Sequence, residues 1–193
     1  MKYSLPEISW HGDRLAILSV DIRVGDCEPY RLATSDTVRD IRLWNLSAPK
    51  EGHHSWHPQF VANIQGDDQA VNVVRWSPDG RYLASADAKG AVIVWERSNS
   101  AAPDIFANEN DSQPENQEMW LAAKRLRRHM DDVADLAWAP DAFPCWGPGS
   151  LFWLAACGRW RTAWAPDASR IATVSVDKTL ILWDIASGTP TFV

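Results

Sequence analysis

The stretch that decides the fold class is VNVVRWSPDGRYLASADAKGAVIVWER, residues 71–97. Three short runs in it, 71–76, 81–86 and 91–96, are rich in β-branched and aromatic residues. The first two runs are separated by Ser-Pro-Asp-Gly and the last two by a second short polar turn. Such runs, bounded by Pro, Gly and Asp, predict antiparallel strands joined by tight turns.

The last of the three runs is apolar on both of its faces. Val92 and Val94 alternate along it with Ile93 and Trp95. Successive side chains of a strand point to opposite faces of the sheet, so this strand has two faces to bury. We therefore expect a sheet that is covered by a neighbouring sheet on each side.

The same pattern occurs twice more in the chain. Residues 133–142 joined to 169–185 read VADLAWAPDASRIATVSVDKTLILWDI, which aligns with residues 71–97 without a gap. A looser copy spans residues 18–46. A repeated strand triplet predicts an architecture of stacked units, because one small sheet cannot bury both its faces alone.

The third copy is interrupted. The hexapeptide Ala-Trp-Ala-Pro-Asp-Ala begins at residue 137 and again at residue 163. Either Trp138 or Trp164 therefore matches Trp76 of the second copy. We interpret residues 143–162 as an insertion in the first hairpin of the third unit, flanked by a duplication. The alternative is an additional hairpin, which the irregular spacing of Pro and Gly in this segment disfavours.

The ends of the strand triplets carry a family resemblance. They read Leu-Trp-Asn, Val-Trp-Glu and Leu-Trp-Asp, and they resemble the blades of WD-repeat β-propellers. The resemblance implies an all-β fold of four-stranded blades. Because closed propellers typically have about 4 to 8 blades, a chain with about three is expected to form a partial or truncated propeller.

The WD-repeat resemblance also implies a structural hydrogen-bond network inside the third blade. His129, Asp177 and Trp183 match its positions, with Ser175 or Thr173 as the hydroxyl. The two other blades hold Val38 and Lys89 at the place of the aspartate, so their networks are expected to be incomplete.

The repeats suggest a division of the chain into units. Residues 1–64 are expected to form blade one, 65–97 the core of blade two, 98–118 a polar loop, and 119–193 blade three with its insertion. The loop is polar and acidic and has no apolar period, which predicts a solvated excursion. The alternative is a docking segment for basic partner surfaces.

The resemblance narrows to a histone-chaperone family. Four segments resemble the start of the family that contains the WD-repeat subunit of chromatin assembly factor 1 and the HIR proteins. They read MKYSLPEISWH, LSVDIR, LATSDTVRDIRLWNL and AVNVVRWSPDGRYLASADAKGAVIVWER. This implies a non-enzymatic nuclear subunit in replication-coupled nucleosome assembly. The implied partners are histones H3–H4, the other chromatin assembly factor subunits and another histone chaperone. An HIR-type replication-independent chaperone, or a WD-repeat scaffold such as a ubiquitin-ligase substrate adaptor, are the alternatives.

Composition excludes several other classes of protein. The 193 residues carry a formal net charge of −6, which disfavours binding to nucleic acid by charge, and no sequence-specific nucleic-acid binding is predicted. Cys27, Cys145 and Cys157 show no CxxC spacing, so neither a disulfide framework nor a zinc knuckle is indicated. No apolar run reaches the roughly 20 residues of a membrane span, and no membrane association is expected.

Motifs for chemistry are also missing from the sequence. His53, His54 and His57 lie in an expected loop with no cysteine nearby, and no metal site is predicted from them. The dense basic run Lys124–His129 favours the end of an outer strand over a nuclear-import patch, because Leu126 interrupts it. There is no P-loop, nucleophile elbow, HExxH or dinucleotide motif, so we predict neither an enzyme nor a cofactor.

Overall fold

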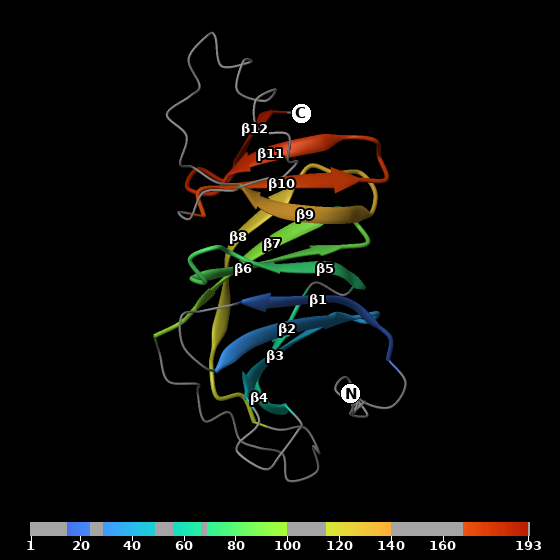
Figure 1. Cartoon of the computed structure of the whole chain (residues 1–193). Coiled ribbons are helices and arrows are strands. Elements are labelled where there is room, and N and C mark those ends of the chain that lie inside the picture. The colour runs from blue at the N-terminus through green and yellow to red at the C-terminus, as the bar shows by residue number, and fades with distance from the viewer. Residues whose placement is uncertain are drawn as a thin grey trace, which may run out of the picture.

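The fold consists of three stacked β-sheets. The computed structural model describes residues 15–23, 29–48, 56–66, 69–99, 115–139 and 168–192. Within these ranges, twelve strands form three antiparallel sheets of four strands each. Figure 1 shows the sheets stacked in chain order, from blue through green to red. The expected all-β class is therefore confirmed.

The strands of each sheet follow one another along the chain. The first sheet contains β1 (Ile17–Arg23), β2 (Tyr30–Asp36), β3 (Asp40–Ser47) and β4 (His57–Gln65). The second contains β5 (Val71–Trp76), β6 (Tyr82–Asp87), β7 (Ala91–Arg97) and β8 (Trp120–Arg127). The third contains β9 (Val133–Ala139), β10 (Arg170–Ser175), β11 (Leu180–Asp184) and β12 (Thr189–Phe192). The first strands of the three sheets lie beside one another, since β1 contacts β5 and β5 contacts β9.

The strand β8 corrects the division of units made from the sequence. Its residues pair with β7, from Trp120 opposite Arg97 to Arg127 opposite Ala91. The expected third blade, 119–193, therefore begins too early, because residues 120–127 complete the second sheet. The physical reason is that the outer edge of β7 still carries backbone groups that need hydrogen-bond partners, and β8 supplies them.

The register of the third sheet shows how the duplicated hexapeptide is used. Trp138 lies opposite Ile171, as Trp76 lies opposite Leu83, so Trp138 and not Trp164 takes the place of Trp76. Ala168, in the second copy, has a φ of 57° and matches Gly80, whose φ is 68°. The first copy thus supplies the strand and the second supplies the residue that leads into β10. Residues 140–167, with the expected insertion at 143–162, lie outside the described residues.

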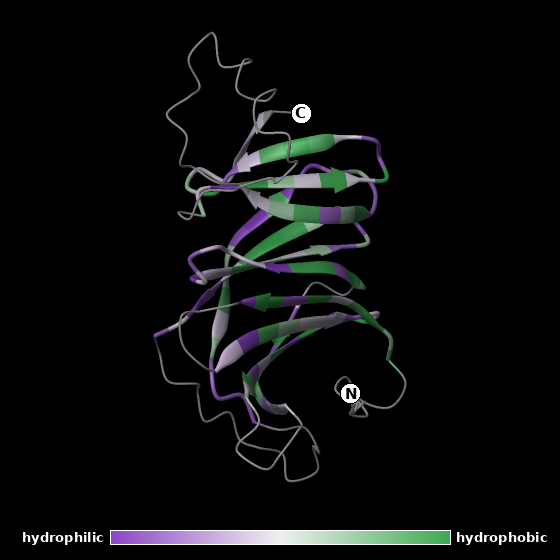
Figure 2. Cartoon of the chain, viewed as in Figure 1, coloured by the Kyte–Doolittle hydropathy of each residue, from purple (hydrophilic) through white to green (hydrophobic). Residues whose placement is uncertain are grey.

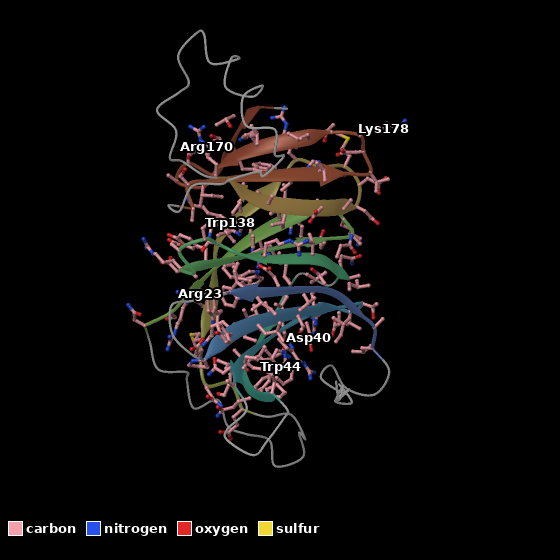
Figure 3. The ribbon with its side chains drawn as sticks, viewed as in Figure 1. Arg23, Asp40, Trp44, Trp138, Arg170 and Lys178 are labelled. Atoms are coloured by element: carbon pink, nitrogen blue, oxygen red, sulfur yellow. The ribbon has the colours of Figure 1, made fainter. Side chains whose placement is uncertain are left out.

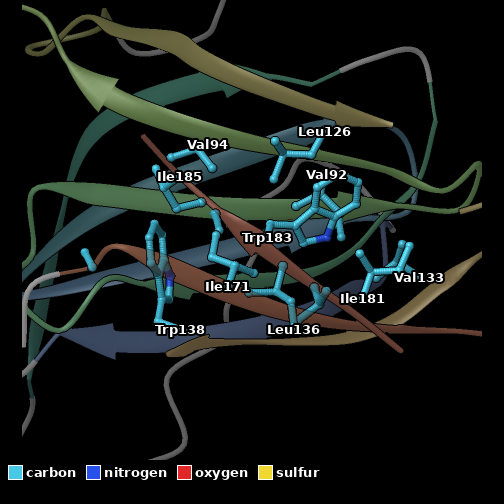
Figure 4. Packing of buried hydrophobic residues seen from close by; sticks show 14 residues of the cluster. Val92, Val94, Leu126, Val133, Leu136, Trp138, Ile171, Ile181, Trp183 and Ile185 are labelled. Carbon is cyan, nitrogen blue, oxygen red and sulfur yellow. The ribbon is translucent and has the colours of Figure 1, made fainter. Parts of the chain in front are cut away.

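The central sheet is packed on both of its faces. Val92 and Val94 of β7 belong to an apolar cluster shared with the third sheet, whereas Ile93 and Trp95 belong to one shared with the first. All four side chains are at most 4% exposed. Figure 4 shows Val92 and Val94 among the buried side chains of the third sheet. The expectation of a strand buried on both faces is confirmed.

The third sheet buries one face of β11. Ile181 and Trp183 are 1% and 2% exposed, whereas Leu180, the first residue of the strand, is 44% exposed. Figure 2 shows hydrophobic residues along the stacked strands and hydrophilic residues at many of the turns. Full burial of one Val, Leu or Ile side chain contributes roughly 1.5–3 kcal/mol. A strand covered on both faces therefore contributes about twice as many such side chains to the core as a strand covered on one.

Candidate functional site

A chain of hydrogen bonds crosses the third sheet from Trp183 to Asp177. The indole Nε1 of Trp183 donates to Thr173 Oγ1 over 2.9 Å. Thr173 Oγ1 lies 2.8 Å from His129 Nε2. His129 Nδ1 lies 3.0 Å from Asp177 Oδ2. These hydrogen bonds connect the β8–β9 connection to β10, to the β10–β11 turn and to β11.

The direction of these bonds assigns the proton of the His129 ring. The Thr173 hydroxyl accepts from Trp183, and it also lies within hydrogen-bonding distance of His129 Nε2 and of the Ile181 carbonyl, at 2.8 and 3.4 Å. Because the Asp177 carboxylate can only accept, His129 Nδ1 carries a proton and donates it to Asp177 Oδ2. Thr173 and His129 are only 1% and 7% exposed. In such an environment, aligned hydrogen bonds polarise and strengthen one another.

Asp177 is held as a carboxylate by several donors. The Thr179 hydroxyl donates to Oδ1 over 2.6 Å, and the Met130 N–H donates to Oδ2 over 3.0 Å. The hydrogen bond from the Thr179 hydroxyl has the largest effect and lowers the pKa of Asp177. Burial raises that pKa, and the N–H groups of Met130 and Thr179 lower it further. Together they hold the pKa of Asp177 well below the ordinary value for aspartate.

The hydroxyl of the network comes from Thr173 rather than Ser175. Ser175 Oγ donates to the backbone carbonyl of Asp131 over 3.0 Å and accepts from the N–H of Asp177 over 3.1 Å. Thr173 pairs with Ile181 across the sheet, so it lies two residues nearer than Ser175 to Ile171, the residue opposite Trp183. Ser175 therefore supports the turn and stands outside the bond between His129 and Trp183.

The first two sheets contain the tryptophan–hydroxyl part of the same arrangement. Trp44 Nε1 donates to Thr34 Oγ1 over 3.0 Å, and Trp95 Nε1 donates to Ser85 Oγ over 2.9 Å. These two hydroxyls were not predicted from the sequence. The signal that identifies them is their common spacing, since each hydroxyl residue precedes its tryptophan by ten positions, as Thr173 precedes Trp183.

An aspartate that was likewise not predicted organises the turn in each of the first two sheets. Asp36 Oδ1 accepts the N–H groups of Val38, Arg39 and Asp40 at 2.9–3.1 Å. Asp87 Oδ1 accepts those of Lys89 and Ala91 at 2.8 and 2.9 Å. Both aspartates stand where Ser175 stands in the third sheet. Val38 and Lys89 do occupy the matching place of Asp177, but a carboxylate two residues earlier serves the turn.

A cluster of charged and polar side chains joins the first sheet to the second. The Arg31 guanidinium on β2 makes two hydrogen bonds to the Glu118 carboxylate, at 2.6 and 2.9 Å. Arg97 and Trp120 also contact this carboxylate, at 3.3 and 3.1 Å. Burial alone would raise the pKa of Glu118, but these contacts outweigh it and hold that pKa below its usual range.

Residues next to Glu118 cover the outer edge of the first sheet. The Asn116 side chain bonds both the N–H and the C=O of Asn63 on β4, at 2.7 and 3.2 Å. The Gln117 N–H donates to the Val61 carbonyl over 2.7 Å. The end of the expected polar loop is thus part of the contact between the first two sheets.

The remaining candidates from the sequence fall into two groups. The basic run begins on β8 and continues through Arg128 and His129 into the connection that follows, as expected for the end of an outer strand. Leu126 is 1% exposed, and Lys124 Nζ donates to the Ala186 carbonyl over 3.0 Å. The side chains of His53, His54 and His57, and the three cysteines, are outside the described part of the structure.

Among the residues that the structure describes, no group of three or more His, Cys, Asp or Glu side chains is arranged to hold a metal. No helix there is long and apolar enough to cross a membrane.

Stacked four-stranded sheets with a tryptophan–hydroxyl bond in each define a WD-repeat β-propeller protein. The model of the WD domain, G-beta repeat, matches residues 149–184. The solved WD40 repeats of RRP9 share the fold, with a TM-score of 0.54 and 16% sequence identity. That similarity covers 94% of this chain and 39% of the RRP9 chain.

The family follows from a second match. The model of the CAF1B/HIR1 beta-propeller domain matches residues 1–146, and the chain belongs to this family. Chromatin assembly factor 1 of Mus musculus has a subunit that is 30% identical over 97% of this chain and 28% of that subunit's own length. Protein HIRA of Zea mays is 31% identical over 95% of this chain and 16% of its own length. Protein HIR1 of Yarrowia lipolytica is 46% identical over 58% of this chain and 12% of its own length.

The expected family is therefore confirmed. The chain spans less than a third of the length of these relatives.

Replacing Thr173 by valine tests the network of the third sheet. Thr173→Val removes the hydroxyl between Trp183 and His129 while keeping the shape of the side chain. Because two buried polar groups then lose a partner, we expect the free energy of unfolding to fall by about 1–3 kcal/mol. Urea unfolding followed by tryptophan fluorescence measures the change. Thr173→Ser keeps the hydroxyl and should cost less, and an equal loss in both variants would contradict the assignment.

The depressed pKa of Asp177 predicts a dependence of stability on pH. Its folded pKa lies below the unfolded value of about 3.9, so its contribution is complete above that value and is lost as the pH falls below it. In Asp177→Asn, we expect the urea midpoint to decline less between about pH 5 and pH 2 than in the unaltered chain. Thr179→Val should flatten the decline in part. A decline as steep in Asp177→Asn as in the unaltered chain would refute this role.

Proposed function

We propose that the chain is a non-enzymatic histone-chaperone subunit that acts in replication-coupled chromatin assembly. The observation that carries the proposal is the family match over residues 1–146, supported by 30% identity with the Mus musculus chromatin assembly factor 1 subunit over 97% of this chain. Its partners are histones H3–H4, the other chromatin assembly factor subunits and another histone chaperone. Its compartment is the nucleus.

The polar interior supports a binding role over catalysis. His129 and Asp177 form the kind of pair that acid–base catalysis uses. Here both ring nitrogens of His129 and both oxygens of Asp177 bond to groups of the fold itself. Two of those groups are backbone N–H groups, from Met130 and Thr179. The pair therefore fixes turns, and the proposed mechanism is recognition of partners by the surfaces that these turns present.

A second candidate is an HIR-type chaperone that acts independently of replication. The 46% identity with Protein HIR1 of Yarrowia lipolytica favours it, although that similarity covers only 58% of this chain. The two candidates share the histone cargo and differ in their partner subunits. The same experiment can separate them.

Affinity purification of the tagged chain from cultured cells tests the proposal. We expect histones H3–H4 and the large chromatin assembly factor subunit to copurify from replicating cells. Recovery of HIR-complex subunits in its place would support the second candidate. Recovery of cullin-type ubiquitin-ligase subunits without histones would contradict both. Thr173→Val, which weakens the fold without altering the surface, serves as the control for specific capture.

A further inference from the structure

One rim of the second and third sheets presents two exposed apolar side chains. Met130 is 93% exposed and Val176 is 59% exposed. The Met130 N–H donates to Asp177 Oδ2 over 3.0 Å, and the Val176 N–H donates to the Asp132 carbonyl over 2.9 Å. The β8–β9 connection and the β10–β11 turn are therefore joined where these side chains emerge. Exposed apolar side chains on a fixed backbone are a common feature of interaction surfaces.

The turn before β7 packs against the same connection. Gly90 has a φ of +82°, and a Cβ atom there would meet the His129 carbonyl oxygen at 2.6 Å and the Asp131 carbonyl oxygen at 3.0 Å. This close approach places Lys89 next to the residues that precede Met130. A hollow of about 400 Å³ lies at this point, and Lys89, Arg127 and His129 are among the residues that line it.

Cations frame the two apolar side chains. Lys89, Arg127 and Arg128 are exposed on the second sheet and the connection that follows it, and Lys178 is exposed on the β10–β11 turn. Figure 3 shows Lys178 at the opposite end of the third sheet from Arg170. We call the surface formed by Lys89, Arg127, Arg128, Met130, Val176 and Lys178 the Met130 rim.

The carboxylates of the same turns are directed at backbone groups. Asp87 accepts the N–H groups of Lys89 and Ala91. Asp177 accepts those of Met130 and Thr179, and Asp131 Oδ1 accepts the N–H of Asp132 at 2.9 Å. Asp87 is buried, Asp132 and Asp177 are partly buried and Asp131 is exposed, so four exposed cations stand beside one exposed carboxylate on this rim.

We propose that the Met130 rim is a docking surface for an acidic, partly apolar peptide segment of a partner protein. An apolar side chain of the peptide covers Met130 and Val176, and its carboxylates pair with the surrounding cations. Charge-assisted hydrogen bonds of this kind are stronger than neutral ones. The net charge of −6 on the chain opposes a long polyanion, whereas a short peptide meets only the rim, where exposed cations outnumber exposed carboxylates.

This partner differs from the histones of the proposed function. Histone surfaces are basic, and a cationic rim repels them. Peptide docking and histone binding are therefore independent of each other. A failure of histone capture leaves the rim intact, and a failure of peptide binding leaves histone capture intact.

The test is a fluorescence anisotropy titration of the whole chain with a fluorescein-labelled peptide of alternating Glu and Leu. We expect saturable binding that weakens as the salt concentration rises from about 0.05 to 0.5 M. Lys89→Glu with Lys178→Glu should weaken binding by about tenfold or more, since two attractive contacts become repulsive. Met130→Ser should weaken it by about threefold or more, through loss of apolar contact.

Matched controls separate the rim from general charge effects. Arg81→Glu with Arg170→Glu makes the same charge change at the other ends of the second and third sheets, and it should alter binding by less than about twofold. A peptide of alternating Lys and Leu should not bind. Equal weakening by both double variants, or no effect of Met130→Ser, would overturn the proposal. Tighter binding of a labelled single-stranded oligonucleotide at the rim would overturn it too, since the surface would then suit phosphates.

Discussion

Face-to-face packing of apolar sheets is the interaction on which the rest of this structure depends. Val92 and Val94 face the third sheet, and Ile93 and Trp95 face the first, so both faces of the central sheet are buried. Each cluster is completed by residues from two sheets that follow each other along the chain. The repeated sequence follows from this constraint, because each unit must offer its neighbour the same kind of apolar face.

Polar groups are concentrated where the sheets end and turn. The His129–Asp177 pair and the carboxylates of Asp36 and Asp87 all accept or share hydrogen bonds with turn residues. Arg31 and Glu118 do the same between the first two sheets. These contacts hold the turns in fixed positions, and the Met130 rim is built on two of them. A packed core thereby presents these turns in a defined arrangement.

Local sequence patterns predicted the features that they control and missed those that depend on distant partners. The strands 71–76 and 91–96 were found because alternating apolar residues and the Ser-Pro-Asp-Gly turn are local signals. The pairing of β8 with β7 was missed, since a long polar stretch separates them and hides their relation. Glu118 was missed for a similar reason, because its partner Arg31 is 87 residues away. Thr173 and Ser175 lie on the same face of one strand, so the sequence alone left the choice of hydroxyl open. The register of β10 with β11 decides it in favour of Thr173.

Hydrogen exchange followed by mass spectrometry can detect the effect of packing on both faces of a sheet. The strands β7 and β11 make a matched pair, since each is hydrogen-bonded to a strand on both sides. They differ in packing, because β7 is buried on both faces whereas Leu180 on β11 is 44% exposed. We expect the amides of β7 to exchange more slowly than those of β11. Exchange in β7 that is as fast as in β11, or faster, would contradict it.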